Sequence, residues 1–140
     1  MPDSYSSSLK LTLLADGDTN WGTTVNNGVT ALIDSSIAGT STITLSSTTD
    51  RTLTDINGTA DEARNMFIRV TGTPGGTTNI ICPSVSKLYF FTNATTGGYS
   101  IVLKTSAGAG VSVPNGDSAV LYCNGTAVVP AVVATGKAFQ

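Results

Sequence analysis

Histidine is absent from this sequence, and charged residues make up only 11% of its 140 positions. Histidine is the commonest general base and the commonest transition-metal ligand in proteins, so its absence excludes the most frequent catalytic and metal-binding arrangements. The seven basic residues are scattered and the pI is about 4.7, which gives no positively charged patch for nucleic acid. We therefore expect no cofactor and no nucleic-acid partner.

Long apolar runs are missing as well. The longest, Val128 to Ala134, is interrupted by Pro130 and is far shorter than the roughly 20 residues that a membrane span needs. The first ten residues, MPDSYSSSLK, contain no apolar stretch of the kind that a secretion signal requires. These absences predict a protein that is made in the cytoplasm and has no membrane partner.

Cysteine occurs only at Cys82 and Cys123, which is too few for a disulfide scaffold. Each cysteine ends a predicted strand, so the two could lie close enough to pair. Assembly in the cytoplasm keeps thiols reduced and favours two buried free cysteines instead. The sequence leaves both alternatives open.

The chain is instead rich in small hydroxylated residues and in apolar residues. Ser and Thr together fill 38 positions, about 27% of the chain, hydrophobic residues fill 40%, and the mean hydropathy is +0.17. This hydrophobicity excludes a disordered polar tract, and Thr and Val favour half-buried strands. Because an ordinary domain carries about 25% charged residues, much of this surface must be neutral or covered by another chain. The composition and length predict a single all-β domain that assembles.

One segment near the N-terminus has a helical pattern. Residues 9–14 alternate apolar and polar side chains, which predicts a strand, and a turn follows. From Trp21 the spacing changes, and the apolar residues form one stripe of an amphipathic helix over residues 21–38: Val25, Val29, Leu32, Ile33 and Ile37. Gly39 fits its C-terminal end. Gly28 and the many Thr and Asn residues are poor helix formers, so packing must hold this helix in place.

Short alternating segments follow Gly39, with turn signals every 8 to 12 residues. They predict about nine short antiparallel strands in a β-sandwich or jelly-roll-like fold. Asn124-Gly125 lies between two such segments and is the strongest hairpin signal. We expect an N-terminal arm at 1–8, one β-rich domain at 9–129 that includes the helix, and an apolar C-terminal arm at 130–140.

The turn before the helix contains a weak candidate for a calcium site. Asp16, Asp18 and Asn20 place oxygen ligands at alternate positions, as calcium-binding loops do. Trp21 occupies the expected glycine position, however, and Asn27 occupies that of the bidentate glutamate. The simpler interpretation is a turn that caps the helix, and we predict no metal site.

Catalytic arrangements are also missing, although Ser is abundant, because no histidine is present to activate a serine. The carboxylates that could serve a glycosidase all lie in predicted turns or loops, where acidic residues are common: Asp50, Asp55, Asp61, Glu62 and Asp117. The segment 61–64 is predicted as a charged loop or a single helical turn. Three glycosylation sequons also coincide with turns and are interpreted as turns: Asn57, Asn93 and Asn124. We predict that the protein is not an enzyme.

Aromatic side chains offer a further possibility, a carbohydrate-binding module that uses Tyr89, Tyr99 or Trp21. Alternate aromatic residues in a strand usually fill a core, so packing is the preferred interpretation of these aromatic residues: Tyr89, Phe90, Phe91 and Tyr99.

Three blocks of the sequence resemble a family of small virion proteins of tailed bacteriophages, which also occurs as the head-proximal part of some tail fibres. The blocks are LKLTLLADGDTNWGTTVNNGVTALIDSSIAG (9–39), DEARNMFIRVTG (61–72) and NIICPSVSKLYFFTNATTGGYSIVLKTSAGAGVSVPNGDSAVLYCNGTAVV (79–129). They cover most of the chain, and none of them is a catalytic motif.

The resemblance implies a β-rich structural protein that assembles on a phage particle. The sequence has no repetitive shaft before Gln140, which favours a capsid decoration (cement) protein that forms a homotrimer on the capsid exterior and binds the major capsid protein across capsomer joints. The alternative is a tail-fibre or tail-adaptor component that docks a receptor-binding protein. Candidate contacts with other copies or with the capsid are apolar residues of the helix and of the C-terminal arm: Trp21, Val25, Val29, Val132, Val133 and Phe139.

Overall fold

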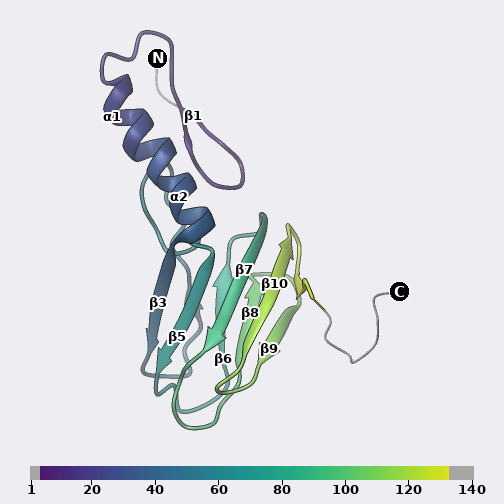
Figure 1. The fold of residues 1–140 in the computed structure, drawn as a ribbon. Helices are drawn as coiled ribbons and strands as arrows, with labels where there is room; N and C mark the ends of the chain where they lie inside the picture. Colours follow the sequence, from purple (N-terminus) through teal and green to yellow (C-terminus); the bar gives the residue numbers. More distant parts are fainter. Residues whose placement is uncertain (1–3, 133–140) are drawn as a thin grey trace.

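A computed structural model describes residues 4–132, and its strands and single helical segment confirm a mostly β protein. The chain begins with two short strands, β1 (Ser4–Tyr5) and β2 (Thr12–Leu13), which pair with each other as a hairpin. Ser4 and Tyr5 fall within the expected N-terminal arm. The hairpin lies beside the helical segment, and together they project beyond one end of the sheets (Figure 1).

The helical segment runs from Trp21 to Ala38, as the apolar spacing predicts. It consists of α1 (Trp21–Val25), a π-helical turn η1 (Asn26–Thr30) and α2 (Ala31–Ala38). Gly39 ends it in an extended conformation, and the glycine is needed for space, because a Cβ atom there would overlap with the Asn65 side chain and lie 2.6 Å from the Ser35 carbonyl oxygen.

The apolar stripe of this helix is not buried as its spacing suggests. Within the segment only Gly28, Leu32 and Ser36 are buried. Trp21 is 66% exposed and Ile37 is 64% exposed. The helix therefore presents apolar side chains that the described part of the chain leaves uncovered.

Two mixed sheets make up the rest of the structure. The five-stranded sheet has the order β11-β10-β7-β5-β3, and the four-stranded sheet has the order β4-β6-β8-β9. The strands of the first are β3 (Thr40–Leu45), β5 (Phe67–Gly72), β7 (Ser86–Asn93), β10 (Ser118–Asn124) and β11 (Val128–Pro130). Those of the second are β4 (Arg51–Thr52), β6 (Thr78–Cys82), β8 (Ile101–Thr105) and β9 (Gly110–Val113).

The prediction that the strands are antiparallel is wrong for the first half of these sheets. From β3 to β8 the chain alternates between the two sheets, so neighbours within each sheet run in parallel: β3 with β5, β5 with β7, β4 with β6, and β6 with β8. Turn residues mark where a strand ends but do not say whether the chain returns to the same sheet. Only the later pairs are antiparallel, including the hairpin β10–β11 that Asn124-Gly125 predicts.

One hydrophobic core draws on both sheets. It is formed by the inward side chains of the alternating strands, among them Ile43, Ile68, Val70, Ile80, Tyr89, Phe91, Ile101, Leu103, Val113, Leu121 and Cys123. The burial of alternate residues in β6, β7 and β8 follows the period of two that the sequence predicts.

Candidate functional site

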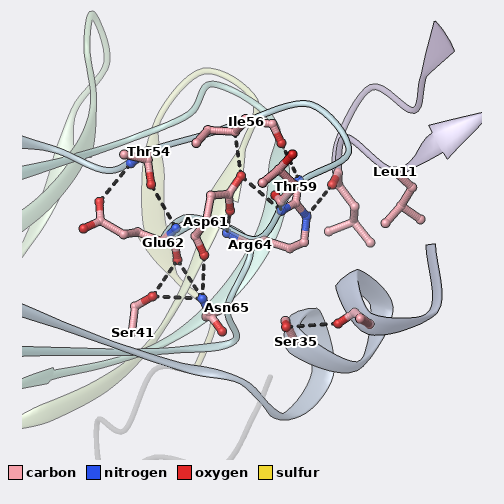
Figure 2. Close-up of polar contacts among 12 residues, drawn as sticks. Leu11, Ser35, Ser41, Thr54, Ile56, Thr59, Asp61, Glu62, Arg64 and Asn65 are labelled. Carbon is pink, nitrogen blue, oxygen red and sulfur yellow. Dashed lines mark hydrogen bonds and ion pairs between the residues drawn. The ribbon is translucent and has the colours of Figure 1, made fainter. Parts of the chain in front are cut away.

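A buried ion pair anchors the segment that joins the hairpin, the helix and the sheets. Arg64 Nη1 lies 3.1 Å from Asp61 Oδ2, and their side chains are only 2% and 0% exposed. Arg64 also donates from Nε to the Leu9 carbonyl oxygen at 2.7 Å and from Nη2 to that of Ile56 at 2.9 Å (Figure 2). One guanidinium thus fixes the region around β2 to a loop more than 50 positions away in the sequence.

The same segment is fastened to the start of both sheets. Glu62 accepts hydrogen bonds from Arg51 Nη2 and from the Thr54 amide. Asn65 donates from Nδ2 to Ser41 Oγ at 2.8 Å (Figure 2). We call residues 61–65 the hub. The sequence predicts this segment only as a charged loop or helical turn, because its partners are distant backbone groups that no local pattern reveals.

Three of the five carboxylates considered for catalysis hold neighbouring groups of the chain: Asp50, Asp61 and Glu62. Asp61 accepts hydrogen bonds from the Ile56 amide at 2.6 Å and the Arg64 amide at 3.0 Å. Asp50 Oδ1 accepts a hydrogen bond from Asn79 Nδ2 at 2.9 Å. Burial raises the pKa of the Asp55 carboxyl, and nearby Lys10 opposes this effect. The geometry therefore uses Asp61, Glu62 and Asp50 to hold backbone and side chains in place.

The candidate calcium loop makes a local turn. Asp18 Oδ1 accepts a hydrogen bond from the Asn20 amide at 2.7 Å, and Gly17 has a positive φ of 85°. Within residues 4–132, no group of three or more His, Cys, Asp or Glu side chains is placed to hold a metal ion. This turn leads into α1 at Trp21, and the side chain of Asn20 makes no capping hydrogen bond to the helix.

The outward side of the five-stranded sheet carries an apolar surface that the sequence analysis did not identify. Phe67 and Phe90 lie in neighbouring strands with their ring centroids 5.1 Å apart. Around them, the strand register brings together the outward residues of β5, β7, β10 and β11. We call this set the outer apolar face: Phe67, Leu88, Phe90, Val120, Tyr122 and Val129.

This face is open and almost without charge. Five of its six residues are between 37% and 39% exposed. Phe67, Phe90 and Val120 line a shallow depression of about 300 Å³. Arg69 is the charged residue that the strands of this sheet direct outward, since Lys87 is buried. The signal in the sequence is the run Leu88 to Phe91, because four consecutive apolar residues must place apolar groups on both sides of a strand.

The predicted contact residues fall in different environments. Trp21 is exposed at the start of α1, whereas Val25 and Val29 are half-buried. Val132 follows β11 and is 52% exposed. Val133 and Phe139 lie outside the described residues. Of the predicted contact residues within 4–132, Trp21 and Val132 are thus exposed, and the outer apolar face is a separate exposed apolar surface.

The aromatic residues proposed for carbohydrate binding are not equivalent. Tyr89 is completely buried in β7, so its ring cannot stack on a sugar in this conformation. Tyr99 is 39% exposed and Trp21 is 66% exposed. Packing, the preferred interpretation from sequence, accounts for Tyr89 and Phe91 but not for Phe90, which belongs to the outer apolar face.

A buried amine lies beneath this face. Lys87 is 8% exposed, and its Nζ donates to the carbonyl oxygens of Asn65 and Leu88 at 3.0 and 3.1 Å. The same atom lies 4.3 Å from the centroid of the Tyr89 ring. Burial lowers the pKa of Lys87 to about 8. Lys87 therefore joins the hub to β7 through contacts that weaken when its charge is lost.

Comparison of the chain with protein-family models, curated proteins and solved structures found no match. Among the described residues, no helix has both the length and the apolar character to cross a membrane.

Proposed function

We propose that this chain is a non-enzymatic structural protein of a tailed-bacteriophage virion, and specifically a capsid decoration protein that assembles as a homotrimer. The observation that carries the proposal is the apolar surface that a single chain leaves open on the outer apolar face and on the helix. The largest apolar patches on soluble proteins are often functional. The phage assignment comes from the resemblance of blocks 9–39, 61–72 and 79–129.

The outer apolar face suits contact between copies. Its residues lie on one side of a sheet, and Arg69 is the one charge beside them among the sheet's outward residues. Five partly exposed residues of this size leave on the order of a few hundred Å² of apolar surface open. A stable interface buries about 800 Å² on each partner, so the contact must extend beyond this face to its polar rim. A second and a third copy of the chain each offer a matching apolar face and a matching polar rim.

The helix and hairpin suit contact with the shell. They project beyond one end of the sheets (Figure 1). The helix also exposes the side chains of Trp21, Ile33 and Ile37. In this arrangement the sheets join the copies, and the projecting ends reach the major capsid protein across capsomer joints. The contribution to the capsid is mechanical, because contacts that exist only in the assembled shell stabilise that state by mass action.

Antibody labelling of the phage particles that encode the chain tests the location. We expect label over the capsid exterior, visible by electron microscopy. Label confined to the tail would instead support the alternative, a tail-fibre or tail-adaptor component, and unlabelled particles would contradict any virion role. A glycan array with the purified protein tests the carbohydrate-binding alternative, and we expect no binding.

A further inference from the structure

The two cysteines meet at a corner where the chain passes from one sheet to the other. Cys82 is the last residue of β6, and β7 begins at Ser86, so residues 83–85 alone connect the two sheets there. Cys123 lies in β10 opposite Lys87, the second residue of β7. The four Cα–Cα steps from Cys82 to Ser86 can span at most about 14 Å, so the end of β6 lies near the start of β7.

The side-chain contacts agree with this topology. The Cys123 thiol donates a weak hydrogen bond to the Pro83 carbonyl oxygen at 3.6 Å, directly after Cys82. Cys123 also lies near enough to Cys82 to contribute to raising the pKa of the Cys82 thiol. Both cysteines are free and buried, at 2% and 0% exposure. The two thiols therefore lie near each other in the reduced protein, on either side of Pro83.

A small oxidant has a route to this pair. A surface depression of about 240 Å³ is lined by Cys82 and Pro83 together with residues of the neighbouring turns. Hydrogen peroxide is small enough to enter such a depression, whereas a bulky disulfide such as oxidised glutathione is not well suited to it. Because Cys82 is only 2% exposed, a peroxide in this depression reaches its thiol through local opening of the neighbouring turns.

We propose that Cys82 and Cys123 form a disulfide that links the two sheets when the folded protein meets a peroxide. The Cys82 thiolate attacks one peroxide oxygen, which gives a sulfenic acid and releases hydroxide. The Cys123 thiol then attacks the sulfenic sulfur, and water leaves. In total, two thiols lose two hydrogens to one peroxide, which becomes two molecules of water. This cross-link is independent of any role in a virion.

Burial also sets the rate of this reaction. It raises the pKa of the Cys82 thiol to about 12, with a further contribution from Cys123. Because the thiolate is the reacting species, the oxidation is slow at neutral pH and accelerates about tenfold per pH unit below that pKa. The pair therefore remains reduced until oxidant and time are both available.

The test is to treat the folded protein with hydrogen peroxide at pH 8.5 and then to alkylate remaining thiols after unfolding. We expect no alkylation, a peptide that joins Cys82 to Cys123 in the non-reduced digest, and an unfolding temperature about 6 to 12 °C higher than that of the reduced protein. Peroxide should give the Cys82→Ala variant no such increase. Two alkylatable thiols in the treated protein, or links only between chains, would overturn the proposal. If the variant does not fold, the linked peptide and the unfolding temperatures of the reduced and oxidised wild-type proteins still test the proposal.

Discussion

At the scale of single residues, the buried ion pair of Arg64 and Asp61 accounts for how the projecting N-terminal region is held on the sheets. The guanidinium reaches the carbonyl oxygens of Leu9, Ile56 and Thr59, and the carboxylate accepts two amide hydrogen bonds. Each buried charge is thus fully partnered. Such a pair adds little free energy by itself, but the loss of one member leaves the other unpaired in the interior.

We therefore expect Arg64→Met to lower the free energy of unfolding by about 3 to 5 kcal/mol, because Asp61 remains buried without its cation. The control is Arg51→Ala, which removes a partly exposed partner of the hub residue Glu62. It breaks an ion pair to Glu62 whose side chains are 39% and 26% exposed, and we expect a loss of about 1 kcal/mol or less. Urea denaturation at one protein concentration measures both. Equal losses for the two variants would contradict the structural role of Arg64.

The lowered pKa of Lys87 makes the free energy of unfolding depend on pH. Its pKa is lowered by burial from 10.5 to about 8, so above pH 8 the folded chain releases a proton that the unfolded chain keeps. The free energy of unfolding then rises with pH. Burial raises the pKa of Cys82 from 9.0 to about 12 and also raises that of Tyr89, and these effects act in the opposite direction above pH 9 and pH 10.

We expect a gain of about 0.5 to 1 kcal/mol between pH 8 and 9, which levels off or reverses at higher pH. Urea unfolding at a series of pH values from 8 upward measures this change in the free energy of unfolding. The Lys87→Met variant should lack the gain and show only the decline. A wild-type curve that is flat or falls from pH 8 to 9 would mean that Lys87 does not lose its proton in the folded state.

At the scale of elements, the helix depends on close packing at one glycine. A Cβ atom at Gly28 would overlap with Thr12 Oγ1 and lie 3.0 Å from Thr12 Cβ in β2. Gly22, in α1, has no atom within 4 Å of such a position. Alanine at Gly22 therefore reports helix propensity alone, whereas alanine at Gly28 also reports packing against β2.

We expect Gly22→Ala to raise the free energy of unfolding by up to about 1 kcal/mol, since Ala is the better helix former. Gly28→Ala should instead lower it by about 1 to 3 kcal/mol, because the added methyl group pushes the helix away from β2. Thermal unfolding of the two variants checks this contrast. A gain in both would show that the helix does not pack on β2 at this position.

Local sequence signals predict where the helix and most strands lie but not which strands are neighbours. The helix at 21–38 and most strands follow from apolar spacing and from glycine and asparagine turns, which are local signals. The parallel pairing of β5 with β7 does not, because a period of two identifies the buried side of a strand but not its neighbour. The hub is equally hidden, since Arg64 binds the carbonyl of Leu9, 55 positions away. The run Leu88 to Phe91 signals an outward apolar group in one strand, but only the strand pairing brings it together with Phe67 and Val120.

At the scale of the whole molecule, the low charge of the surface agrees with a protein that its own copies cover. We expect the purified wild-type protein to have a mass of about 43 kDa by light scattering, three times the 14.2 kDa of one chain. Phe67→Ser with Phe90→Ser should give a monomer, because it removes the centre of the outer apolar face. Both residues are 39% exposed, so the fold should tolerate the change.

The control for this variant is Ile56→Ser, which replaces a residue that is 47% exposed in a loop and outside the five-stranded sheet. It should leave the mass unchanged. A wild-type monomer at tens of micromolar concentration, or a trimer that survives the double substitution, would contradict the assignment of this face to contacts between copies.

The heat stability of phage heads most directly tests the central claim that this protein reinforces a capsid. Heads that lack the protein are heated with and without the purified chain, and the release of DNA is followed by dye fluorescence. The account predicts release at a lower temperature without the protein and a return to the normal temperature once added protein saturates the capsid. Equal DNA-release temperatures for heads with saturating protein and heads without it, or no binding of the protein to the heads, would contradict the claim.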